Sequence, residues 1–213
     1  CVQVTFDGVT AVCNLDPGHK ADGAAFDRFG ILNVVKSADS PGELWIDDVV
    51  INGEPQSFNS DPGWEGLGNH VTYESEDVRP RFNFGYSATS YAGGSVPGEI
   101  GGLFFRGDCR YPERLACYGD RLDVLTLNKP LRASGKVVLL RAVSDSSTLF
   151  GFYHSEHSME VNESQASAIP KDFLGLYIEG PSREGFFVYP VYRTHGTEGN
   201  HAANADPPHI LPD

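Results

Sequence analysis

The run Gly42-Glu-Leu-Trp-Ile-Asp-Asp-Val-Val-Ile-Asn-Gly53 decides the fold class of this chain. It is rich in β-favouring residues and ends in Asn-Gly, the strongest short-range signal for a hairpin turn. Because side chains alternate along a strand, the odd-numbered residues from Glu43 to Ile51 are expected on one face. The even-numbered residues from Leu44 to Val50 are expected on the other face. An aromatic residue beside carboxylates on one strand face suits both a sandwich core and a sugar-binding surface.

The composition extends this pattern to the whole chain. The 213 residues include 24 glycines and 14 prolines, and 11% of the residues are aromatic. Strand-like runs separated by turn signals recur from Val2 to Arg193, helical periodicity is scarce, and residues 118–127 fit either a single helical turn or a strand. The sequence therefore predicts an all-β fold, an antiparallel and jelly-roll-like β-sandwich with long rim loops. We expect residues 1–193 to form one domain and residues 194–213 to be a linker or a terminal arm.

The charge narrows the range of partners. The formal net charge is −13 at pH 7, so a nucleic-acid backbone would be repelled. Neutral glycans, divalent cations or basic partners fit such a surface better. No apolar run approaches the ~20 residues that span a bilayer, so the sequence predicts no membrane span.

The four cysteines fall into two local pairs. A three-residue hairpin loop with Gly8 in the left-handed position would place Cys1 opposite Cys13, within bridging range. Cys109 and Cys117 enclose a second short loop. No C-x-x-C spacing is present, so disulfides are favoured over a zinc site. Two disulfides, one of them closing the N-terminal hairpin, predict a secreted or cell-surface protein.

Two long glycine-rich connections, residues 59–70 and 91–102, are typical of rim loops that carry ligand contacts. Trp64 and Tyr91 in these loops either stack on a ligand or cap the ends of the core. Aromatic rings suit carbohydrate because one face of a pyranose ring is a sheet of C–H groups. The predicted ligand-binding residues are Trp45, Trp64, Asn69, His70, Tyr86, Tyr91 and Arg106.

Three strand patterns carry a resemblance to a known group of proteins. They are the segment from Leu44 to Gly53, Gly98-Glu-Ile-Gly-Gly-Leu-Phe-Phe-Arg106 and Phe150-Gly-Phe-Tyr153. These patterns resemble strands of bacterial extracellular jelly-roll modules in the concanavalin A-like lectin and glucanase group. The resemblance implies two antiparallel sheets, a concave face and, often, a structural calcium ion.

Calcium is the predicted cofactor. Asp47, Asp48 and Asp61 provide the hard oxygen ligands that Ca²⁺ prefers, close together in the sequence. Asp48 is expected on the more apolar face of its strand, where a carboxylate needs a cation or several hydrogen-bond donors. The alternative is that Asp48 accepts backbone N–H groups from the next turn.

The enzymes of the concanavalin A-like lectin and glucanase group use catalytic residues that this chain lacks. Retaining glycoside hydrolysis needs two carboxylates ~5 Å apart, and the Glu-x-Asp-x-x-Glu signature of the group is absent. Glu43 and Asp47 share the predicted face but stand four residues apart, which is too far without a bend.

The remaining catalytic candidates are Tyr153, His154 and His157. A spacing of three places the two histidines on opposite faces of a strand. A turn at Ser155 would converge them, with Glu156 as a third metal ligand or Tyr153 as an acid.

These observations favour a secreted module that recognises a polysaccharide or oligosaccharide. The first alternative is a glycan lyase or glycoside hydrolase on the same fold. The second is a structural subunit that self-associates, in which the tail after Thr194 pairs with the sheet edge of a neighbouring copy.

Overall fold

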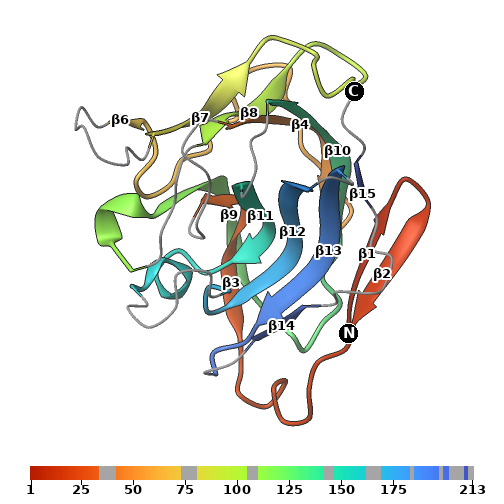
Figure 1. The fold of residues 1–213 in the computed structure, drawn as a ribbon, viewed down its shortest axis with the longest axis vertical. Helices are drawn as coiled ribbons and strands as arrows, with labels where there is room; N and C mark the ends of the chain where they lie inside the picture. The colour runs from red at the N-terminus through yellow and green to blue at the C-terminus, as the bar shows by residue number, and fades with distance from the viewer. Residues whose placement is uncertain are drawn as a thin grey trace.

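The computed structural model describes residues 1–33, 42–72, 81–104, 110–141, 146–161, 169–182, 185–196, 199–201 and 209–210. Over these residues the chain is all-β with antiparallel sheets, which confirms the predicted β-sandwich class (Figure 1). The helices in these ranges are two short 3-10 segments, η1 (Pro112–Arg114) and η2 (His157–Met159). None of the described segments forms a helix with the length and hydropathy needed to cross a membrane.

Two large sheets make up the sandwich. The six-stranded sheet follows the order β10 (Ala133–Arg141), β4 (Gly42–Ile51), β8 (Glu99–Phe104), β7 (Arg81–Ser87) and β6 (Val71–Thr72), with β5 (Glu54–Pro55) paired to β4. The seven-stranded sheet follows the order β14 (Gly199–His201), β13 (Gly185–Arg193), β12 (Phe173–Ser182), β11 (Ser146–Tyr153), β3 (Ala25–Asn33) and β9 (Ala116–Thr126), with β15 (His209–Ile210) paired to β13. In Figure 1 the six-stranded sheet arches over the other, and the hairpin of β1 (Val2–Phe6) and β2 (Val9–Cys13) lies beside β13.

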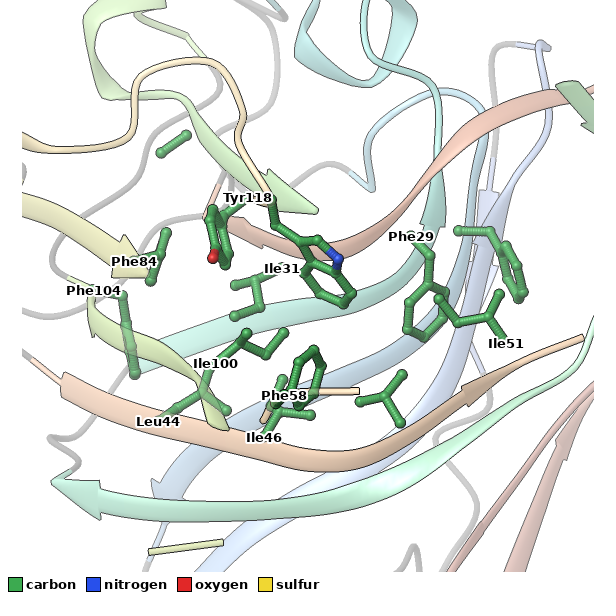
Figure 2. Packing of buried hydrophobic residues seen from close by; sticks show 14 of the residues in the cluster. Phe29, Ile31, Leu44, Ile46, Ile51, Phe58, Phe84, Ile100, Phe104 and Tyr118 are labelled. Carbon is green, nitrogen blue, oxygen red and sulfur yellow. The ribbon is translucent and has the colours of Figure 1, made fainter. Parts of the chain in front are cut away.

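The core lies between the inward faces of the two sheets. Figure 2 shows side chains from both sheets meeting there, among them Leu44, Ile46 and Ile100 from one sheet and Phe29, Ile31 and Tyr118 from the other. All six are buried. The connection after β5 adds Phe58 and Trp64 to the same cluster. The core therefore contains both strand residues and residues of a long loop.

Strand β4 does not keep one alternation along its length. Up to Ile46 the even-numbered residues are buried, and from Asp47 onward the odd-numbered residues are buried. Asp48 has a φ of 50°, and the facing strand β10 shifts its register at this point, so the strand carries a β-bulge. The predicted grouping of Trp45 with Asp47 on one face is therefore wrong. Asp47 takes the buried position that was expected for Asp48.

The N-terminal hairpin is present, but its turn is one residue shorter than predicted. Asp7 and Gly8 both have positive φ angles and form a two-residue turn, which places Val2 opposite Cys13. A register shift of one residue moves a side chain to the other face of the strand. Cys13 is consequently buried with Val2, while Cys1 is exposed, and both are free thiols. The predicted Cys1–Cys13 disulfide is therefore wrong.

The second predicted disulfide joined Cys109 to Cys117. Cys109 lies outside the described residues. Cys117 is a buried free thiol whose sulfur accepts the backbone N–H of Leu67 at 3.2 Å. Burial raises the pKa of the Cys117 thiol, and a thiol kept neutral by burial has a packing role rather than a reactive one.

The sequence allows two alternatives each for residues 118–127 and for the tail after residue 194, and both segments join the seven-stranded sheet. Residues 118–127 belong almost entirely to strand β9. The described parts of the tail after residue 194 return to β13 of the same chain, where β14 and β15 pair with its two halves. Within the described residues the tail therefore acts as a terminal arm on its own sheet.

Candidate functional site

An open pocket of about 480 Å³ lies where strands β4, β7 and β8 approach the loop of residues 59–70. Trp45, Trp64, His70 and Tyr86, all predicted to bind ligand, line this pocket together. Its remaining lining residues are Asp61, Gly63, Glu65, Asn83, Phe84, Gly85, Gly101 and Tyr118. Residues that are distant in the sequence thus form one aromatic and polar site.

Trp64 forms a wall of the pocket from within the core. It is 5% exposed and packs edge-on against Phe58, with ring centroids 5.6 Å apart and an interplanar angle of 85°. The glycines of its loop permit this packing, because a Cβ at Gly66 would lie 1.9 Å from the carbonyl oxygen of Cys117. The glycine-rich composition therefore fits the loop onto β9, and Trp64 caps the core, which was one of its two expected roles.

Trp45 is the aromatic residue that faces outward. The register places it opposite Gly101 on β8, and Gly101 opposite Gly85 on β7, so two adjacent strands present no side chain beside it. A Cβ at Gly85 would meet no atom within 4 Å. The indole Nε1 donates a 2.7 Å hydrogen bond to Glu43, which fixes the ring. Tyr91, which is 52% exposed, lies beside it with ring centroids 6.2 Å apart.

The polar residues at the pocket edge differ in their roles. Asn69 pairs through both amide atoms with the backbone of Phe84, at 2.9 and 2.8 Å, so its side chain is committed to holding the loop against β7. His70 is exposed at the rim, where its Nδ1 lies 2.9 Å from Oδ1 of Asn83. Arg106 lies outside the described residues. His70 and Asn83 are therefore exposed polar groups at this part of the pocket.

Carboxylates also line the pocket, and Oε2 of Glu65 lies 3.7 Å from Nε2 of His70. Oδ1 of Asp61 accepts the backbone N–H of Gly63 at 2.8 Å, and Glu65 lies beside it in the same loop. Burial raises the pKa of Tyr118 far above its ordinary value, and the charges of Asp61 and Glu65 add to the effect. Tyr118 therefore keeps its hydroxyl proton. The polar lining consists of hydroxyl, amide, imidazole and carboxylate groups, which suits a hydroxyl-rich ligand without negative charge.

The predicted calcium ligands have separate partners. Oδ1 of Asp47 accepts the backbone N–H of Asp48 at 2.6 Å. Asp48 pairs with Lys136 at 2.9 Å and accepts hydrogen bonds from the backbone and hydroxyl of Ser95. Asp61 caps its own turn. These three carboxylates do not bring three ligand atoms within 4.8 Å of one another.

Asp47 gives a prediction for stability and pH. It is 4% exposed, its Oδ2 has no hydrogen-bond partner, and burial raises its pKa. Because the pKa of Asp47 is higher in the folded state than in the unfolded state, ionisation of this carboxyl destabilises the fold. The destabilisation is largest above the folded-state pKa and decreases as the pH falls toward the ordinary carboxyl pKa of about 3.9. We expect Asp47→Asn to increase the free energy of unfolding at pH 7 by about 1 kcal/mol, with a smaller gain at pH 4. Urea titrations at both pH values measure it.

The same variant tests calcium. An ion held by Asp47 would reverse the sign, so that Asp47→Asn destabilises the protein and EDTA lowers the melting temperature of the wild type. Asp48→Asn is the control, because its carboxylate lies next to Asp47 but is paired with Lys136. It is expected to show no gain at pH 7.

The predicted catalytic candidates separate into two environments. A turn after β11 brings His154 and His157 together, with ring centroids 3.9 Å apart and nearly parallel planes, as the turn at Ser155 would require. Tyr153 points the other way. It is fully buried, and this burial, with a smaller contribution from the Sγ of Cys117 beside it, raises its pKa well above the ordinary value. Tyr153 therefore has no access to the histidines as an acid.

Two residues that the sequence analysis missed complete the histidine group. Oδ2 of Asp172 lies 2.7 Å from Nδ1 of His157 and 3.1 Å from Nδ1 of His195, so Asp172 takes the place expected for Glu156. The antiparallel order β11–β12–β13 explains the meeting, since the end of β11, the start of β12 and the end of β13 share one end of the sheet (Figure 1). No local spacing signals this group, because its three members come from separate segments.

A second charged pair borders this group. Lys171, next to Asp172, pairs with Glu160. The hydrogen bond from Lys171 lowers the pKa of the Glu160 carboxyl, and His157 and His195 contribute in the same direction. The histidines therefore lie within electrostatic range of two carboxylates.

Comparisons with protein-family profiles, with curated proteins and with solved structures give no match to this chain.

Proposed function

We propose that this protein binds a neutral polysaccharide or oligosaccharide in the pocket beside Trp45. The observation that carries the proposal is that Trp45, Tyr86 and His70, chosen from the sequence as sugar-binding residues, line one open pocket. The outward Trp45 and the exposed Tyr91 provide the apolar surface on which a pyranose face packs. His70 and Asn83, whose Nδ1 and Oδ1 atoms lie 2.9 Å apart at the exposed rim, would supply the polar contacts to hydroxyl groups.

The charge of the protein selects among glycans. The chain carries a net charge of −13, and Asp61 and Glu65 line the pocket. A uronate or sulfated chain would be repelled by this field. The proposed ligand is therefore a neutral glycan, and a secreted or cell-surface location would give the protein access to such a polymer.

Removal of the aromatic platform tests the proposal. We expect Trp45→Ala and Tyr91→Ala each to weaken binding of a soluble neutral glycan by ~1–3 kcal/mol, which is roughly 5- to 150-fold in the dissociation constant. Affinity electrophoresis in gels containing β-glucan, xylan or galactomannan, followed by calorimetry, measures the change. Tyr111→Ala is the matched control, since Tyr111 is 41% exposed, does not line the pocket and packs against Arg114, whereas Tyr91 packs against Trp45.

The outcomes separate the candidate functions. Equal binding by Tyr91→Ala, Trp45→Ala and wild type would place recognition elsewhere. Release of reducing ends from a bound polymer would support the enzyme alternative. Absence of binding to neutral and acidic glycans alike would contradict the proposal and favour a structural subunit, which size measurement in solution would then examine.

A further inference from the structure

We propose that His157, Asp172 and His195 form a binding site for a divalent transition-metal ion of the Zn²⁺ type. One ligand atom from each residue lies within 4.8 Å of the other two. This group is separate from the aromatic pocket, and the proposal does not rest on carbohydrate binding.

The donor set selects the class of ion. Two imidazole nitrogens and one carboxylate oxygen are ligands of Zn²⁺ and of neighbouring transition metals. Ca²⁺ and Mg²⁺ prefer sites built from oxygen atoms. The site therefore differs in chemistry from the calcium site expected at Asp47, Asp48 and Asp61.

The distances are close to those that a bound ion requires. With metal–ligand distances of about 2.0–2.1 Å and tetrahedral angles, neighbouring ligand atoms stand ~3.3 Å apart. Oδ2 of Asp172 lies 2.7 and 3.1 Å from the two Nδ1 atoms. Lengthening of these two contacts by about 0.6 and 0.2 Å would reach the spacing of a bound ion, and the ligand atoms of all three residues already lie within 4.8 Å of one another.

Burial provides an independent argument for a cation. The side chain of Asp172 is 1% exposed, and its Oδ1 has no hydrogen-bond partner. A buried carboxylate with an unpaired oxygen is costly unless a cation or a water satisfies it. The side chains of His157 and His195 are 31% and 50% exposed, so one side of the group is open for a fourth ligand such as water.

The ligands are held in position by separate contacts. The hydroxyl of Ser158 donates to the backbone carbonyl oxygens of Lys171 and Asp172, at 2.6 and 3.2 Å. These contacts hold Asp172 at a φ of 50°, which is unfavourable for a residue other than glycine. The backbone N–H of His195 donates to the carbonyl oxygen of Gly23 at 2.8 Å.

His154 is a positioning residue rather than a ligand. Its Nδ1 accepts the backbone N–H groups of Glu156 and His157, at 3.2 and 3.3 Å. A backbone N–H can only donate, so the lone pair of this nitrogen is already used. The stacking of His154 on His157 then restricts the rotation of the ligand ring.

The test is titration of the full chain with Zn²⁺ by calorimetry and by thermal unfolding. We expect one ion per chain and a melting temperature that rises with the Zn²⁺ concentration. Loss of an outer-shell partner alone costs 10- to 100-fold in metal affinity, so His157→Gln and His195→Gln should each weaken binding by ~100-fold or more. Ca²⁺ at the same concentration should give neither heat nor a shift. Co²⁺ in place of Zn²⁺ should give a visible absorption band that both variants lose.

Two further variants exclude other sources of binding. His70→Gln removes an exposed imidazole outside the group and should bind as the wild type does. Cys1→Ser removes the exposed thiol, which itself attracts zinc, and should also bind as the wild type does. Unchanged affinity in His195→Gln, loss of all binding in Cys1→Ser, or no stoichiometric ion in the wild type would overturn the proposal. In the last case the group is a hydrogen-bonded carboxylate only.

Discussion

Replacement of Trp64 by alanine is expected to lower the free energy of unfolding by about 3–5 kcal/mol. The ring belongs to the main core cluster, packs edge-on against Phe58 and lies 6.0 Å from the ring of Tyr118. Its removal leaves a cavity between the sheets, and neighbours held in strands fill such a cavity only in part. Urea unfolding followed by far-ultraviolet circular dichroism measures the loss without depending on tryptophan fluorescence.

Trp45→Ala is the matched control for this substitution. Trp45 lies outside the core cluster and on the outward side of β4, so its loss is expected to cost about 1 kcal/mol or less. The two tryptophans should therefore separate stability from binding: Trp64→Ala unfolds more easily, and Trp45→Ala binds glycan more weakly. A stable Trp64→Ala protein, within 1 kcal/mol of wild type, would contradict the packing described above.

The second large effect is expected at a row of glycines that crosses the seven-stranded sheet. Gly119, Gly30, Gly151 and Gly175 lie opposite one another on β9, β3, β11 and β12. A Cβ at Gly151 would lie 2.4 Å from the carbonyl oxygen of Leu174 and 2.6 Å from the Cα of Gly175. We expect Gly151→Ala to reduce stability by about 1–3 kcal/mol, because backbone atoms in a paired strand cannot move aside.

Gly85→Ala is the control for the glycine row. Gly85 also lies within a strand, but a Cβ there would meet nothing within 4 Å. Its replacement should change stability by no more than about 0.5 kcal/mol, measured by thermal unfolding of the two variants side by side. Equal effects at Gly85 and Gly151 would show that close approach of the strands is not the reason for the glycine row.

The sequence predicted the fold class because that class depends on local patterns. Alternating residues such as those of β4, with turn residues between the strands, require each segment to be extended and to bury one face. The all-β sandwich follows from this requirement. The burial of Asp47, Val49 and Ile51 did not follow, because the bulge at Asp48 reverses the alternation after Ile46.

An error of one residue in the predicted length of a turn changes which residues of the hairpin face each other. The sequence predicts a turn at Asp7 and Gly8, but the turn in the structure is one residue shorter than the expected loop. That single residue decides whether Cys1 and Cys13 face each other or lie on opposite sides of the hairpin.

The sequence alone determined that the chain folds into antiparallel strands and carries a net charge of −13, while the repulsion of polyanions and the sugar ligand stay predictions. Only the tertiary structure decided which aromatic residues meet in one pocket, that Trp64 packs into the core, and that His157, Asp172 and His195 converge. The physical reason is that periodicity and composition act over neighbouring residues. A site assembled from the ends of several strands depends on strand order and register, which long-range packing sets.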